Sequence, residues 1–136
     1  DAEGNGGDND PLDVMEIGSQ VLPMGSVVPV KVLGSLELID EGETDHKIIA
    51  IAANDPDAGA IHDMVSLERV KPGVIADLID WLKNYKTSDG KPQNRLAQEE
   101  PTTREEAVEI IGHTHERWGS LMKGEVPSTG FWLADQ

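Results

Sequence analysis

Three aspartates near the start of the chain are spaced so that they could bind a divalent cation. Asp8, Asp10 and Asp13 fall within six residues, and Pro11 keeps this stretch out of a helix because it fixes its own φ and disfavours helical geometry at the preceding residue. Mg²⁺ and Ca²⁺ prefer such all-oxygen ligands. The same residue types are also common in solvated turns. An EF-hand loop is excluded because Asp13 stands where the invariant glycine belongs. The spacing alone leaves two alternatives, a metal site and a solvated acidic turn.

A second acidic turn, residues 40–47, repeats this pattern and ends in a lysine. If both turns lie at the same end of neighbouring strands, their carboxylates face one cavity, where they would repel strongly without cations or raised pKa values. Divalent ions there could lower the pKa of a bound water and orient a phosphate ester or anhydride. Lys47, Lys86 and Lys91 are candidate phosphate contacts, although each alone is more typical of a solvated surface. The predicted acidic cluster comprises Asp8, Asp10, Asp13, Asp40 and Asp45.

Composition excludes several classes of function. Eleven basic against 26 acidic side chains give a formal charge of −15, whereas nucleic acids and anionic lipids need a basic surface. There is no cysteine, so disulfides, thiolate catalysis and cysteine-bound zinc are excluded. No apolar run approaches the ~20 residues of a membrane span, and no signal peptide is visible. His113 and His115 are two residues apart on a predicted helix and point to nearly opposite sides, so they cannot share an ion.

The elements that must position these groups are strands in the first half and helices in the second. Residues 1–13 form a predicted loop, and strands are expected over 14–17, 27–34, 36–39 and 47–53. Ser66 is expected to cap a short helical turn to Val70, and Pro72 to open a helix that runs to about Lys86. Thr102 and Thr103, followed by Glu105 and Glu106, predict a doubly capped helix to about Met122. Strands followed by two principal helices indicate an α+β fold. The residues expected to pack that last helix are Ala107, Ile110, Ile111, Thr114, Trp118, Leu121 and Met122.

Several motifs together resemble the soluble family I inorganic pyrophosphatases, in their eukaryotic-type branch. They are Gly-Asp-Asn-Asp-Pro-Leu-Asp-Val at 7–14, Asp-Glu-Gly-Glu-Thr-Asp-His-Lys at 40–47, Ile-Ile-Ala-Ile at 48–51, Tyr-Lys at 85–86 and Asp-Gly-Lys-Pro at 89–92. The resemblance covers essentially residues 7–123. It implies one pyrophosphatase-like domain over residues 1–136, in which OB-like β-barrel strands are followed by two principal helices packed against them.

The resemblance also implies Mg²⁺-dependent hydrolysis of pyrophosphate to two phosphates. Asp8, Asp13 and Asp45 would hold one activating metal, and Asp13 would bridge to a second. Asp40 and Asp45 would hold a further, substrate-associated Mg²⁺. Asp10 would accept the proton of the attacking water. Phosphate oxygens would be contacted by Lys47, Tyr85 and Lys86, with Lys91 a weaker candidate.

The chain departs from the family pattern at its start, because members carry a substantial segment before the first motif. That segment includes barrel strands and further metal and phosphate ligands. We therefore expect a fragment, or a split protein completed by a partner chain, rather than a structural remnant, since the aspartates and Tyr85-Lys86 are intact. Position 46 is histidine where a bulkier aromatic is expected. The alternatives to the enzyme are a non-catalytic interaction subunit with the same fold and a simple cation-binding module. A homodimer and a cytoplasmic location, with an organelle as the alternative, are expected from the resemblance.

Overall fold

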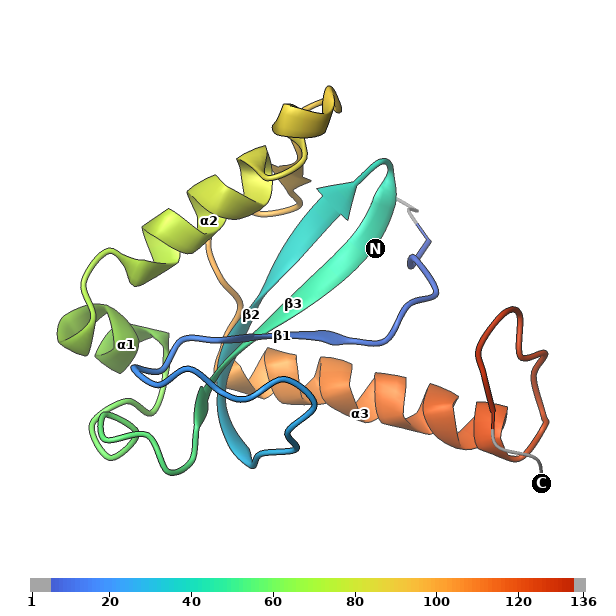
Figure 1. Cartoon of the computed structure of the whole chain (residues 1–136), viewed down its shortest axis with the longest axis horizontal. Coiled ribbons are helices and arrows are strands. Elements are labelled where there is room, and N and C mark those ends of the chain that lie inside the picture. Colours follow the sequence, from blue (N-terminus) through green and yellow to red (C-terminus); the bar gives the residue numbers. More distant parts are fainter. Residues whose placement is uncertain (1–5, 134–136) are drawn as a thin grey trace.

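A computed structural model of the chain describes residues 6–133 and shows an α+β arrangement, as predicted (Figure 1). Four strands form one sheet in the order β1-β3-β2-β4. Figure 1 shows α1 and α2 along one side of the strands and α3 along the opposite side. None of the helices in this range is long and apolar enough to cross a membrane. The elements in chain order are β1 (Asp13–Glu16), β2 (Val30–Asp40), β3 (Glu43–Ala52), α1 (Met64–Val70), α2 (Val74–Asn84), the 3-10 helix η1 (Thr87–Asp89), β4 (Arg95–Leu96) and α3 (Arg104–Met122).

A long antiparallel hairpin of β2 and β3 forms the centre of the sheet. The sequence predicted two strands over 27–34 and 36–39, which is wrong: β2 is continuous, with a register shift between Val32 and Gly34. A Cβ on Gly34 would lie 2.6 Å from the carbonyl oxygen of Thr102, so the glycine lets another segment approach the strand closely. The two-residue turn at Glu41-Gly42 has positive φ at both positions, 51° and 91°, which matches the twist of a tight hairpin.

Strand β1 pairs with β3 in parallel, and this pairing brings the two acidic turns together. Asp13 at the start of β1 lies opposite Lys47 near the start of β3. Seven residues ahead of β1, the carbonyl of Gly6 accepts a hydrogen bond from the backbone N–H of Thr44 in β3, 2.8 Å away. Of the predicted loop over 1–13, the first five residues lie outside the described range, and Asp13 belongs to β1 rather than to the loop. Because parallel strands start at the same edge, both turns lie at one end of the sheet.

Apolar side chains of the hairpin pack against α1 and α2 to form the core. Ile75 and Leu82 of α2 are buried, and Leu78 and Ile79 pack against the same cluster, so the apolar residues of the helix share one face at helical spacing. Tyr85 follows the last residue of α2 and lines the cavity at the acidic end of the sheet. The core members are Leu33, Leu36, Leu38, Ile49, Ile51, Ala58, Ile61, Leu67, Ile75, Leu82 and Leu96.

Two helix starts differ from the prediction. Asp63, not Ser66, is the N-cap of α1; Ser66 is its third residue and completes a reciprocal capping box with Asp63, as the two side chains can both serve as acceptors. Pro72 does not lie in the first turn of α2, because the N-cap of this helix is Gly73. The helix ends at Asn84 rather than at Lys86.

Helix α3 begins as predicted but packs less extensively than expected. Thr103 and Glu106 form its capping box, whereas Thr102 is engaged with Ser35 of β2 instead of acting as a second cap. Ala107 is the one fully buried residue of α3, and Trp118 is 55% exposed. The expected packing of Trp118 is therefore wrong for the described residues, because the second half of the helix extends away from the sheet (Figure 1).

Candidate active site

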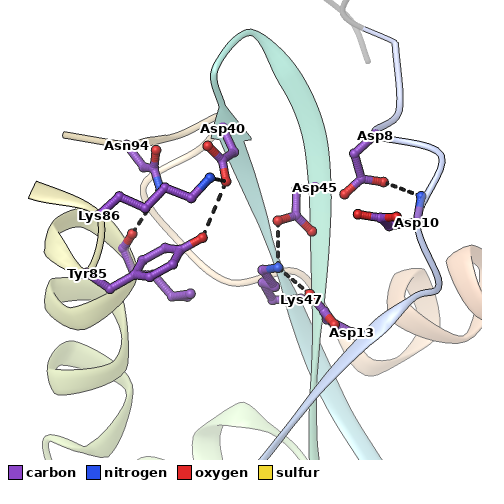
Figure 2. Close-up of polar contacts among 10 residues, drawn as sticks. Asp8, Asp10, Asp13, Asp40, Asp45, Lys47, Tyr85, Lys86 and Asn94 are labelled. Carbon is purple, nitrogen blue, oxygen red and sulfur yellow. Dashed lines mark hydrogen bonds and ion pairs between the residues drawn. The ribbon is translucent and has the colours of Figure 1, made fainter. Parts of the chain in front are cut away.

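The acidic end of the sheet contains a cavity of about 480 Å³ that is lined by every predicted site residue except the weaker candidate Lys91. The expectation that the five aspartates face one cavity is confirmed. Figure 2 shows Asp8, Asp10 and Asp13 on one side, the ring of Tyr85 and the ammonium of Lys86 on the other, and β2 and β3 between them. The lining residues are Asp8, Asp10, Pro11, Asp13, Asp40, Glu41, Glu43, Asp45, Lys47, Tyr85 and Lys86.

Strand alternation explains why side chains from four segments converge here. Along β3, Asp45 and Lys47 are two residues apart and therefore project from the same face of the sheet. They lie opposite Leu38 and Leu36 of β2, whose side chains belong to the core. The cavity is thus the polar continuation of the core face, at the edge where the apolar residues give way to acidic ones.

Lys47 is the buried cation at the centre of this cluster. It is 7% exposed, and its Nζ lies 2.5 Å from carboxylate oxygens of both Asp13 and Asp45. Burial tends to lower the pKa of Lys47, but hydrogen bonds to the two carboxylates outweigh this and raise it. For Asp45 burial raises the pKa, the hydrogen bond and charge of Lys47 oppose that change, and the charges of Asp8 and Asp13 add to it. The lysine therefore offsets part of the burial penalty on the ionised form of Asp45.

A second lysine and a tyrosine close the opposite wall. Lys86 forms an ion pair with Asp40, and this hydrogen bond raises the pKa of Lys86. The hydroxyl of Tyr85 donates to the same carboxylate oxygen of Asp40 over 3.4 Å. Within the described part of the chain, the other oxygen of Asp40 is buried and has no hydrogen-bond partner. Asp40 thus presents one free acceptor beside two groups suited to phosphate oxygens.

The first acidic motif forms a tight turn that places Asp10 against the cavity. The backbone N–H of Asp10 donates to the carboxylate of Asp8 over 3.0 Å, which is an Asx-type turn. Asn9 between them has a φ of 58°, a left-handed conformation that asparagine tolerates better than most residues. The proline-containing motif is therefore both a turn and a wall of the site, so the two alternatives derived from its spacing are compatible.

The donor set fits divalent cations in charge and in atom type. Seven carboxylates line the cavity against two ammonium groups, and carboxylate oxygens are the ligands that hard cations prefer. The unpaired buried oxygen of Asp40 fits the same conclusion. Among residues 6–133, no three carboxylate or imidazole groups already stand where they could hold one ion together. Binding would therefore need side chains to turn, with Lys47 moving off at least one of its carboxylates.

The sequence-based prediction missed two residues that line the cavity. Glu41 and Glu43 line the cavity; their place in the second acidic turn was the available signal, but neither was assigned a role. Lys91, the weaker candidate, pairs with Glu41 at 3.0 Å and does not line the cavity. His46 is a neighbour of both Asp45 and Lys47 on β3 and projects to the opposite face, where its Nδ1 is buried with no partner among the described residues.

An acidic cavity edged by lysines and a tyrosine is typical of proteins that handle phosphate groups together with divalent cations. Comparison with known proteins identifies one family within this class. The family model described as inorganic pyrophosphatase matches residues 2–119. The chain therefore belongs to the inorganic pyrophosphatase family, as the resemblance of its motifs indicated.

Individual relatives agree in sequence and in fold. The chain is 48% identical to an inorganic pyrophosphatase of Mus musculus over 91% of its own length and 43% of that protein. It is 49% identical to the mitochondrial inorganic pyrophosphatase 2 of the same species, over 95% of this chain and 41% of that one. The structure of inorganic pyrophosphatase from Schistosoma japonicum superposes with a TM-score of 0.82 at 50% identity, covering 85% of this chain and 41% of that one. An N-terminally truncated vacuolar soluble pyrophosphatase of Trypanosoma cruzi, solved in complex with PPi, gives 0.86 at 36% identity, over 88% and 46%. The chain thus spans less than half the length of these relatives.

Proposed function

We propose that this chain takes part in the hydrolysis of inorganic pyrophosphate to two phosphates, with Mg²⁺ as the cofactor. The observation that carries the proposal is the convergence of five aspartates, two lysines and one tyrosine on a single cavity in a member of this family. The complex of a Trypanosoma cruzi relative with PPi supports the choice of substrate.

In this proposal Asp8, Asp13 and Asp45 would hold the activating Mg²⁺, and Asp13 would also serve a second ion. Asp40 and Asp45 would hold the ion that accompanies the substrate. When bound, Mg²⁺ would neutralise phosphate charge and lower the pKa of the water that it holds. The free oxygen of Asp40 and the excess of carboxylates in the cavity support these assignments.

The remaining roles belong to side chains that act on water and on phosphate. Asp10, which lines the cavity from the tight turn, accepts the proton of the attacking water. Lys47, Lys86 and Tyr85 contact the phosphate oxygens and thereby orient the phosphorus for attack. Both lysines are ion-paired with carboxylates, so their contacts to phosphate would replace these contacts.

The proposal is tested by the release of phosphate from pyrophosphate in the presence of Mg²⁺. The release is measured on the chain alone and on any complex that co-purifies with it. Asp10→Asn should lower the rate about 100-fold or more, as expected for loss of a general base. Asp77→Asn removes the same charge from an exposed position on α2 and should leave the rate unchanged. Circular dichroism shows whether both variants are folded. Activity that is absent in both preparations, or that survives Asp10→Asn, would contradict the enzymatic role.

Two finer assignments accompany the proposal. We infer a homodimer, in keeping with the eukaryotic-type resemblance, which light scattering of the purified chain measures directly. We also infer a location in the cytoplasm or in an organelle, since one close relative is described as mitochondrial. Tagged protein in cell fractions separates these two locations.

A further inference from the structure

Trp81 is a large apolar residue of α2 that the core does not use. Its side chain is 53% exposed, whereas its neighbour Leu82 is buried. The indole instead stacks on the ring of Tyr85, with centroids 5.0 Å apart and planes inclined by 22°. Aromatic pairs in this geometry attract each other beyond the burial of their area. The contact therefore links an exposed helix position to a residue that lines the cavity.

The backbone makes this contact specific. Trp81 and Tyr85 are four residues apart and thus share one face of the helix. Helical side chains lean toward the N-terminus, so the Tyr85 ring leans back over the indole. Tyr85 follows the last residue of α2, and its N–H donates to the carbonyl of Trp81 over 2.8 Å. Helix ends fray readily, so a ring at this position needs a partner to hold it.

The orientation of the Tyr85 ring decides where two polar groups stand in the cavity. Its hydroxyl points to Asp40 over 3.4 Å, as Figure 2 shows. The ammonium of Lys86 lies 5.6 Å from the ring centroid, within the range of cation–π attraction, and pairs with the same Asp40. A ring that swung away would misplace the hydroxyl and remove one support of the ammonium.

We propose that Trp81 is a positioning residue that holds Tyr85 in the orientation required for phosphate binding. The proposal rests on the proposed function of the cavity and adds to it a residue outside the cavity lining. Trp81 is not among the residues that line the cavity, and it acts through the Tyr85 ring. Its effect should therefore depend on the Tyr85 hydroxyl.

Nuclear magnetic resonance of the tyrosine ring tests the contact without any need for activity. Tyr85 is the only tyrosine of the 136 residues, so labelled tyrosine gives one set of ring signals. Trp81→Ala should shift these signals and sharpen them toward a freely rotating ring, while Trp81→Phe should keep most of the restriction. Trp118→Ala is a matched control, because Trp118 is 55% exposed and stacks on His115 of α3 at 5.3 Å. It should leave the signals unchanged. Unchanged signals in Trp81→Ala would overturn the proposal.

Binding of imidodiphosphate, a non-hydrolysable analogue of pyrophosphate, tests the consequence. Calorimetry with Mg²⁺ should show about 2- to 10-fold weaker binding for Trp81→Ala, the range expected for one aromatic stack. Trp81→Phe should recover most of the affinity. In a Tyr85→Phe background, Trp81→Ala should cause a smaller further loss, since the hydroxyl that the stack positions is already absent and only the support of Lys86 by the ring remains to be lost. An equal loss in both backgrounds would overturn the proposal. That result would indicate a general structural role for Trp81 or a partner surface at this position. Intact analogue binding without phosphate release would contradict the proposed function alone.

Discussion

Replacement of Lys47 by methionine should destabilise the chain in a way that divalent cations relieve. Methionine keeps the length and apolar stem of the side chain but removes the ammonium from between Asp13 and Asp45. The two carboxylates would then face each other and Asp8 without a counter-charge, in a place where Asp45 is almost fully buried. Unpaired buried charge is among the costliest defects in a folded protein.

The magnitude follows from the exposure of each partner. The side chain of Asp45 is 12% exposed, so loss of its partner should cost about 3 kcal/mol, at the lower end for a broken buried pair. The side chain of Asp13 is 59% exposed, so its pair with Lys47 should contribute about 0.5 kcal/mol, as for a surface pair. In the presence of EDTA, the free energy of unfolding should therefore fall by about 3 to 4 kcal/mol.

The pH dependence has a defined sign for each group. The pKa of Asp45 is raised in the fold, so its ionised form is penalised there, and this penalty grows as pH rises above about 4. Without Lys47 the penalty should be larger, so the stability gap between variant and wild type should widen from pH 4 to neutral pH. The pKa of Lys47 is also raised in the fold. Its stabilisation is thus complete below about pH 10 and is lost as pH rises through its folded pKa.

Urea denaturation with and without saturating Mg²⁺ measures the effect. In Mg²⁺ the loss caused by Lys47→Met should shrink to about 1 kcal/mol or less, because an ion that binds only the folded chain stabilises it by mass action. Lys71→Met is the matched control: Lys71 pairs with Asp57 at 3.1 Å outside the cavity. Its loss should be about 0.5 kcal/mol and independent of Mg²⁺. A Lys47→Met loss that is equal with and without Mg²⁺, or no larger than that of Lys71→Met, would refute the reasoning.

Two further predictions concern the scaffold. Gly18→Ala should lower the free energy of unfolding by about 1 to 3 kcal/mol, because a Cβ there would lie 2.5 Å from carboxylate oxygens of Glu16 and Asp55. Urea titration measures this loss. Gly59→Ala is the control, because its Cβ would meet nothing within 4 Å. Hydrogen bonds from the third residue of α1 lower the pKa of Asp63, so the stability that this cap contributes is present above about pH 4 and is lost as pH falls through its folded pKa. Asp63→Asn keeps the cap but removes its titration, so the urea midpoint should depend less on pH below about pH 4. A pH dependence equal to that of the wild type would contradict this.

The sequence predicted the site better than the scaffold, for a physical reason. Strand alternation and two acidic turns suffice to place Asp45 and Lys47 together, since both features are local. The pairing of Asp13 with Lys47 is not local, yet it follows once both turns are assigned to one edge of the sheet. Glu41 and Glu43 were missed as lining residues because a tight hairpin turn directs adjacent side chains in ways that spacing does not encode.

The scaffold errors arise where tertiary contacts override local pattern. Strand β4 is two residues long and pairs with Leu38 and Ile39 through its backbone, so no alternation marks it in the sequence. The start of α1 was misassigned because Asp63 and Ser66 can both cap, and only the observed backbone selects Asp63. The expected packing of Trp118 failed because a helical stripe predicts a buried face only along the part of the helix that meets the sheet.

The lysines of the cavity connect stability to the proposed chemistry. Lys47 forms ion pairs with Asp13 and Asp45, and Lys86 pairs with Asp40, so both ammonium groups offset part of the negative charge of the cavity. If Mg²⁺ takes over that role, both ammonium groups become available to phosphate oxygens. This exchange requires the lysines to be paired strongly enough to keep the fold and weakly enough to leave the carboxylates. Hydrogen bonds to carboxylates, acting against burial, raise the pKa of both lysines, so the pairing favours the charged ammonium. The relief of Lys47→Met by Mg²⁺ measures the second requirement.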